Sequence, residues 1–182
     1  MEEWLIVLLC CLGGILSLWL LLIIIVLILL FVLKNKIVRN RISINIILAQ
    51  KFDVANVLAK FLLENGIDLP SEVKDEFNIG DKPNFNSFTT FERKTVGKRI
   101  DECISILKEI AENSFLKDNM RYITLSDSIA DAEKQYRHMI LTHNNNVWAY
   151  NYWVGFIPFR PISKIFNIQK KKQINENNKE IK

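Results

Sequence analysis

The sequence predicts an all-α protein in which an N-terminal transmembrane helix leads into an antiparallel bundle of long helices. Three observations predict this fold class: residues 4–33 form an apolar run without a charged side chain, apolar residues recur at helical spacing along most of the later chain, and no alternating segment of strand type has comparable length. The net charge of +4 over 182 residues hides this division, because it averages two unlike parts. A fully soluble protein is therefore excluded, and six Gly, four Pro and three Cys exclude the collagen-like and disulfide-framework classes.

Residues 4–33 predict a helix that crosses a membrane. A span needs about 20 apolar residues, so this run of 30 residues must tilt or protrude. A cleaved signal peptide fits the pattern less well, because Glu2 and Glu3 make the start acidic and no small-x-small cleavage site follows the apolar run. The vicinal thiols of Cys10 and Cys11 leave two interpretations open, which are acylation and simple tolerance within an apolar helix.

Basic residues stand on one side of the predicted span only. The short outer end, residues 1–3, contains no Lys or Arg, whereas four basic residues follow the span: Lys34, Lys36, Arg39 and Arg41. Lys and Arg resist transfer across a bilayer. The asymmetry therefore predicts a single-pass protein of the cell membrane, with its N-terminus outside and its later residues in the cytoplasm.

Residues 34–146 predict the helical bundle. A first helix over 37–65 ends at Gly66 with Pro70 as a stop, and a long connection over 67–88 follows, with room for one or two helical turns within 71–77. Thr89 and Glu92 form a capping box for the next helix, whose apolar stripe comprises Val96, Ile100, Cys103, Ile104, Leu107, Ile110, Ala111 and Phe115. A third helix carries Ile129, Ala132, Tyr136, Met139, Ile140 and His143, and the Asn run at 144–146 either ends it or frays it.

Aromatic residues gather in residues 147–168. The candidate contact residues of this segment are Trp148, Tyr150, Tyr152, Trp153, Phe156, Phe159 and Arg160. Two interpretations stay open: the segment closes the end of the bundle by burying its rings, or it lies in the lipid headgroup region that Trp and Tyr favour. The tail over 169–182 is predicted to be disordered, and its Lys170, Lys171 and Lys172 either return to anionic lipid or stay solvated.

The sequence contains no motif for catalysis, phosphate binding or metal binding. His138 and His143 lie five residues apart, which is a poor spacing for a shared ligand on a helix, and Cys103 falls on an apolar stripe as a core thiol. We therefore expect no enzymatic activity, no cofactor and no metal. Nucleic acid is not an expected partner either, because residues 42–163 carry 14 Lys and Arg against 16 Asp and Glu.

Short blocks spread over nearly the whole chain carry a family resemblance. They are Ile44-Asn45-Ile46-Ile47-Leu48 with Lys51-Phe52-Asp53-Val54 and Asn56-Val57, Ala111 with Phe115-Leu116, Ile129-Ala130 with Ala132, Tyr136 and Asn144, and Gly155-Phe156 with Pro158, Pro161 and Phe166. In their order along the chain these blocks resemble the bacterial LemA family. The departures are Ala55 in place of an Ile-Pro pair, Glu133 in place of an arginine, and the connection at 67–88 in place of continuous helix. The resemblance implies a membrane-anchored antiparallel helical bundle and implies no known reaction.

The expected function follows from these features. We expect a non-enzymatic scaffold or adaptor held at the cytoplasmic face of the membrane, whose partners are the lipid bilayer and other membrane-associated proteins. The alternative is a peripheral lipid-binding protein that grips anionic membrane through the aromatic segment and the two basic clusters.

Overall fold

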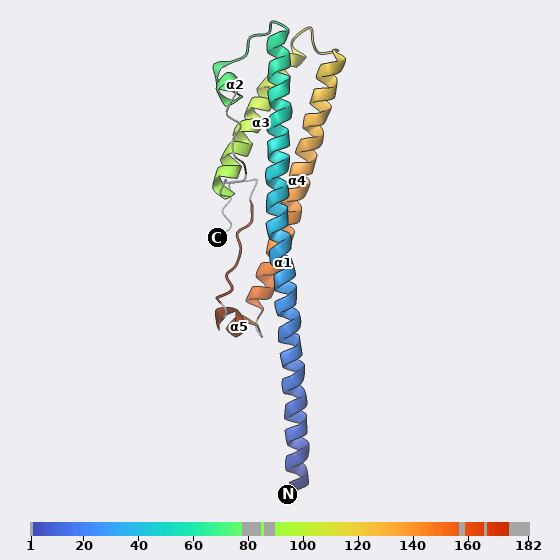
Figure 1. The fold of residues 1–182 in the computed structure, drawn as a ribbon, viewed down its shortest axis with the longest axis vertical. Helices are drawn as coiled ribbons and strands as arrows, with labels where there is room; N and C mark the ends of the chain where they lie inside the picture. Colours follow the sequence, from blue (N-terminus) through green and yellow to red (C-terminus); the bar gives the residue numbers. More distant parts are fainter. Residues whose placement is uncertain (1, 78–84, 86–89, 157–158, 166, 175–182) are drawn as a thin grey trace. The chain divides into compact units, whose positions relative to one another are not determined.

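A computed structural model describes residues 2–77, 85, 90–156, 159–165 and 167–174. Within these residues the secondary structure is helical, without a strand, which confirms the predicted all-α class. The helices in Figure 1 are α1 (Glu2–Glu64), α2 (Ser71–Glu76), α3 (Thr90–Glu112), α4 (Met120–Gly155) and α5 (Arg160–Ile165).

The chain divides into two compact units, which are described separately. The anchor unit takes its described residues from Met1–Val38 and Asn144–Gln173, and the core unit takes its described residues from Arg39–His143 and Ile174–Lys182. Because α1 and α4 each contribute to both units, neither unit is a continuous stretch of the chain.

The first helix is longer than the sequence predicted, because the apolar run and the following helix form one element. No proline lies between Glu2 and Glu64, and the polar residues after the apolar run are compatible with a helix. The helix ends in a Schellman motif: the N–H of Ile67 donates to the carbonyl of Leu62 at 3.1 Å, and the N–H of Gly66 donates to that of Leu63 at 3.0 Å. Gly66 has a φ of +79°, so its predicted role as the cap is confirmed.

The described residues of the core unit form a large apolar cluster and a smaller one of Ile44, Ile140 and Ile174. The large cluster is built from α1, α3 and α4 together with the short helix α2, and its largest fully buried side chains are Leu48, Leu58, Leu62, Val73, Ile100, Ile104, Leu107 and Ile129. The stripe predicted for α3 therefore faces this core. Phe115 is an exception with 78% of its surface exposed, because the helix has already ended at Glu112, and Leu116 takes the buried place at 2%.

The directions of the helices in the core unit follow from pairs of contacting residues. Along α4, Arg121 pairs with Glu64 of α1 and Glu133 pairs with Lys51, so these two helices run in opposite directions (Figure 1). Lys51 also pairs with Asp101 of α3, and Leu48 lies beside Gly97, so α3 runs parallel to α1. Short links produce antiparallel neighbours, as between α3 and α4, whereas the long connection after α1 permits the parallel pair.

Three further predictions about the elements have different outcomes. The Asn run at 144–146 neither ends nor frays α4, which continues to Gly155, so the first half of the aromatic segment is helical. The capping box of Thr89 and Glu92 depends on side chains that the structure does not describe. The turn predicted within 71–77 is confirmed as α2.

Candidate functional site

The apolar run of α1 has a bare part and a covered part. Residues 4–22 are exposed along their whole length. At 1.5 Å per residue this bare stretch is about 28 Å long, close to the thickness of the hydrocarbon core of a bilayer. From residue 23 onward one face of α1 is covered by the rest of the anchor unit, and the buried residues of that contact are Val26, Leu30, Ile37, Val147, Tyr150, Val154 and Phe159. The second part of the run, residues 23–33, is thus covered by protein on one face and exposed on the other.

Helical geometry divides the predicted aromatic segment between two faces of α4. Tyr150 and, beyond the helix, Phe159 are only 4% and 1% exposed and belong to the core of the anchor unit. Trp148 and Tyr152 are 63% and 53% exposed and stack with their ring centroids 5.8 Å apart. Just beyond the helix, the half-buried ring of Phe156 lies 6.3 Å from that of Tyr152 and packs against the core of the anchor unit.

We refer to Trp148, Tyr152, Trp153 and Phe156 as the aromatic row. The ring of Trp153 meets both Tyr152 and Phe156 edge-on, each at a centroid distance of 5.6 Å. Such edge and offset contacts are the favoured arrangements of aromatic rings. The row is thus a preformed apolar surface with polar ring atoms, and its outer members are open to solvent.

The basic residues predicted as contacts are all exposed. In the anchor unit these are Lys34, Lys36, Arg160, Lys170, Lys171 and Lys172, and in the core unit they are Arg39 and Arg41. Among the tail lysines, Lys171 is held by hydrogen bonds to its backbone. The side-chain amide of Asn151 donates to the carbonyl of Lys171 and accepts from its N–H, both at 2.8 Å. The first residues of the predicted tail therefore lie along α4.

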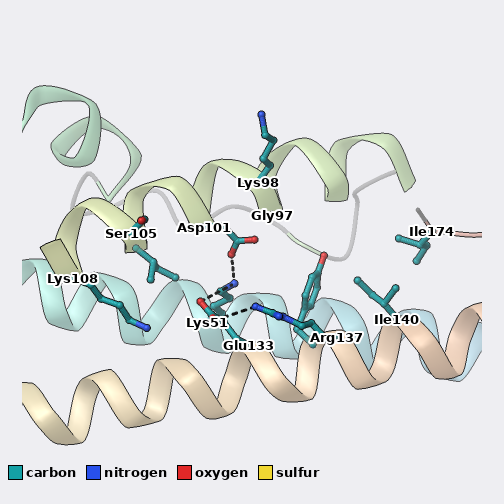
Figure 2. A pocket seen from close by; sticks show the side chains of 12 residues that line it. Lys51, Gly97, Lys98, Asp101, Ser105, Lys108, Glu133, Arg137, Ile140 and Ile174 are labelled. Carbon is teal, nitrogen blue, oxygen red and sulfur yellow. Dashed lines mark hydrogen bonds and ion pairs between the residues drawn. The ribbon is translucent and has the colours of Figure 1, made fainter. Parts of the chain in front are cut away.

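A buried ionic group in the core unit is a site that sequence reasoning missed. Lys51 of α1 is only 2% exposed and forms ion pairs with Asp101 of α3 and, at 3.8 Å, with Glu133 of α4. Arg137 in turn lies 3.8 Å from Glu133. Figure 2 shows these four side chains converging from three helices in a pocket of about 570 Å³. The signal in the sequence was a lysine at the core spacing of Leu48, Lys51 and Ala55.

The chemistry of this pocket is that of a structural ion pair. Lys51 is paired with two carboxylates from different helices, and the centroid of the Tyr136 ring lies 5.8 Å from its Nζ. No group of three or more metal-ligating side chains occurs among the residues that the structure describes.

The buried thiol and the buried imidazole occupy packing positions. Cys103 is 7% exposed, and burial, reinforced by the carboxylate of Glu76, raises the pKa of its thiol. Since the thiolate is the reactive form, Cys103 is a weak nucleophile, as expected of a core thiol. His143 is 4% exposed and lies on the predicted stripe of α4.

No protein-family model, curated protein or solved structure matches this chain. The resemblance to the LemA family therefore rests on the residue blocks alone.

Proposed function

We propose that this protein is a single-pass membrane protein that acts through contacts of a helical bundle at the cytoplasmic face, and not through catalysis. The observation that carries the proposal is α1, the described helix that is long and apolar enough to cross a membrane. Its residues 4–22 are all exposed. Each large apolar side chain left in water costs about 1.5–3 kcal/mol relative to burial, so a bilayer is the environment that suits this stretch.

The packing of the anchor unit supports retention of the helix as an anchor. A signal peptide would be removed with its apolar run. Val26 and Leu30 belong to that run, and both are 4% exposed because α4 and the residues after it cover them. Cleavage beyond the run would therefore open the apolar core of the anchor unit. The same architecture is implied by the resemblance to the LemA family.

An anchor of this kind favours a scaffold or adaptor. It confines the attached domain to a thin layer next to the membrane, which raises its effective concentration for other membrane-associated proteins. The basic residues Lys34 and Lys36 on the domain side of the span favour a cytoplasmic position for that domain.

Cysteine labelling in intact cells tests the anchor and its orientation. In a full-length background without Cys10, Cys11 and Cys103, a reagent that cannot cross membranes should label Glu3→Cys in intact cells and Lys117→Cys only after lysis. Lys117 is exposed in the turn between α3 and α4, so access to the residue itself is not limiting. Labelling of Lys117→Cys in intact cells would contradict the orientation, and release of the protein by alkaline carbonate would contradict the anchor.

A second candidate function is lipid binding, and the aromatic row favours it. Exposed Trp and Tyr side chains prefer the headgroup region of a membrane, and Trp148 and Tyr152 belong to the unit that contains the span. Brominated lipids should quench the fluorescence of a full-length variant that keeps Trp148 and has Phe at the other tryptophans. If brominated lipids do not quench the fluorescence of Trp148 but acrylamide in the water does, the aromatic row faces water and is available to a protein partner.

A further inference from the structure

The charge of the anchor unit is strongly one-sided. Beyond residue 3 its two segments contain no Asp or Glu, whereas they contain seven basic residues: Lys34, Lys36, Arg160, Lys164, Lys170, Lys171 and Lys172. These cations therefore have no carboxylate side chain within residues 4–38 and 144–173 to neutralise them. Because the same unit carries the bare apolar helix, the polyanion closest to it is the surface of an anionic bilayer.

Two of these cations lie at one pocket. A hollow of about 380 Å³ is lined by Leu27, Phe31 and Lys34 of α1, by Tyr150 of α4, and by Gln169 and Lys171 of the segment after α5. None of its lining residues is acidic. Lys34 and Lys171 thus supply two ammonium groups, and Leu27 and Phe31 supply an apolar wall.

The apolar wall of the pocket continues the lipid-facing surface of α1. The exposed residues Ile24, Ile25 and Ile28 of α1 precede Phe31, which is 65% exposed. Lys34 follows Phe31 after three residues and therefore lies on the same face of the helix. An acyl chain lying along this face would bring its phosphate to the lysine.

The second lysine is held in place before any ligand binds. Asn151 makes two hydrogen bonds of 2.8 Å to the backbone of Lys171, one from each end of its side-chain amide. A fixed backbone lowers the entropy lost when the lysine meets an anion. Asn151 is thus a positioning residue for the pocket.

We propose that this pocket binds one anionic phospholipid, with Lys34 and Lys171 at the headgroup phosphate and Leu27 and Phe31 against the start of an acyl chain. The proposal rests on the proposed membrane anchor, because the lipid enters from the bilayer that surrounds α1. Inorganic phosphate shares the charge but not the acyl chain, so it should bind far more weakly than the lipid.

A matched pair of double variants tests the proposal in the full-length protein in detergent micelles. The Lys34→Ala, Lys171→Ala variant removes the two pocket lysines, and the Lys36→Ala, Lys172→Ala variant removes two exposed neighbours that do not line the pocket. Titration with short-chain phosphatidylglycerol, read by native mass spectrometry, should show about 30-fold weaker binding for the first variant. The second should lose less than about threefold. Asn151→Ala, which releases Lys171, should lose about threefold to tenfold.

The outcomes separate the pocket from its alternatives. Equal losses for the two double variants would overturn the pocket and leave only a general attraction to anionic lipid. Equal binding of phosphatidylcholine, or saturation by inorganic phosphate at the same concentrations, would overturn the specificity for an anionic phospholipid. Circular dichroism should show the same helix content in all variants. If the protein resists carbonate extraction while lipid binding is unchanged by Lys34→Ala, Lys171→Ala, the pocket is refuted and the anchor stands.

Discussion

Gly66 ends the longest helix of the protein because it adopts a conformation that other residues avoid. Its φ of +79° allows the two hydrogen bonds that close the C-terminus of α1, and the chain then turns toward α2. A Cβ atom added at Gly66 would meet nothing within 4 Å. The requirement for glycine is therefore one of backbone conformation and not of space.

The substitution Gly66→Ala should destabilise the protein by about 1 kcal/mol, because in the left-handed conformation the Cβ of alanine comes too close to a backbone carbonyl oxygen. The free energy of unfolding can be measured by denaturant titration of the detergent-solubilised full chain. Gly66→Asn is the matched control and should lose less, because Asn tolerates this conformation better. An Ala variant as stable as the wild type would refute this account of the cap.

Lys51 shows a second role for a single residue. It stands at a core position of α1, where an unpaired charge would be costly, and is matched by carboxylates from two other helices. The sequence contains the lysine and both acids, yet their spacing along the chain, at 51, 101 and 133, carries no local signal of a contact.

At the scale of elements, this ionic group joins α1, α3 and α4. Ion pairs that are buried at one end specify which residues of two helices stand opposite each other, since a shift of one turn would leave the buried ammonium without a partner. Gly97 contributes to the same contact, because a Cβ atom there would lie 3.2 Å from the hydroxyl of Tyr136. A larger residue at position 97 would therefore require the Tyr136 side chain to shift by a few tenths of an ångström.

The substitution Asp101→Asn should lower the free energy of unfolding by about 2 kcal/mol. Removing one partner of a buried pair costs about 3–5 kcal/mol. We expect a smaller loss of stability here, because Asp101 is half exposed and Glu133 still pairs with Lys51 in the variant. Denaturant titration would measure the loss.

Glu102→Gln is the matched control on the same helix. Glu102 pairs with Lys98 at 3.2 Å, with both side chains more than half exposed, so its loss should stay below about 0.5 kcal/mol. Equal effects of Asp101→Asn and Glu102→Gln would mean that burial of Lys51 does not strengthen its ion pair.

The continuation of α4 through the Asn run is also determined by packing between elements. Asn is a poor helix former, which is why the sequence left open whether the helix ends at 144–146. The residues on either side of the run, His143 and Val147, are 4% and 0% exposed. Packing of these neighbours outweighs a propensity difference of about 0.7 kcal/mol per residue.

At the scale of the whole molecule, α1 begins with a stretch, residues 4–22, whose side chains are exposed. Because residues 4–22 bury no side chain against the protein, deleting them should change the free energy of unfolding of the remaining chain in detergent by less than about 0.5 kcal/mol. A deletion extended through residue 30 also removes Val26 and Leu30, and should cost at least about 3 kcal/mol. Thermal unfolding followed by circular dichroism would measure both. A large loss for the shorter deletion would show that 4–22 stabilises the fold directly.

Apolar periodicity predicted most of the helices. It did not predict that α1 continues across residue 34 or that α3 ends at Glu112. The apolar stripes of α3 and α4 and the cap at Gly66 are local patterns, so a single sequence reveals them. The union of the apolar run with the next helix is not visible in such patterns, because hydrophobicity changes at 34 while the backbone conformation does not. The exposed position of Phe115 was missed for the related reason that its stripe depends on a helix that ends three residues earlier.

The sequence by itself determined the helical class, the lone apolar helix and the concentration of positive charge next to it, because these depend on composition and on spacing within one segment. Only the tertiary structure decided which aromatic residues turn outward, that Lys51 meets Asp101 and Glu133, and that Lys34 and Lys171 share a pocket. Each of these is a contact between segments far apart in the chain, and helix packing, not local spacing, selects which of the many pairs become neighbours.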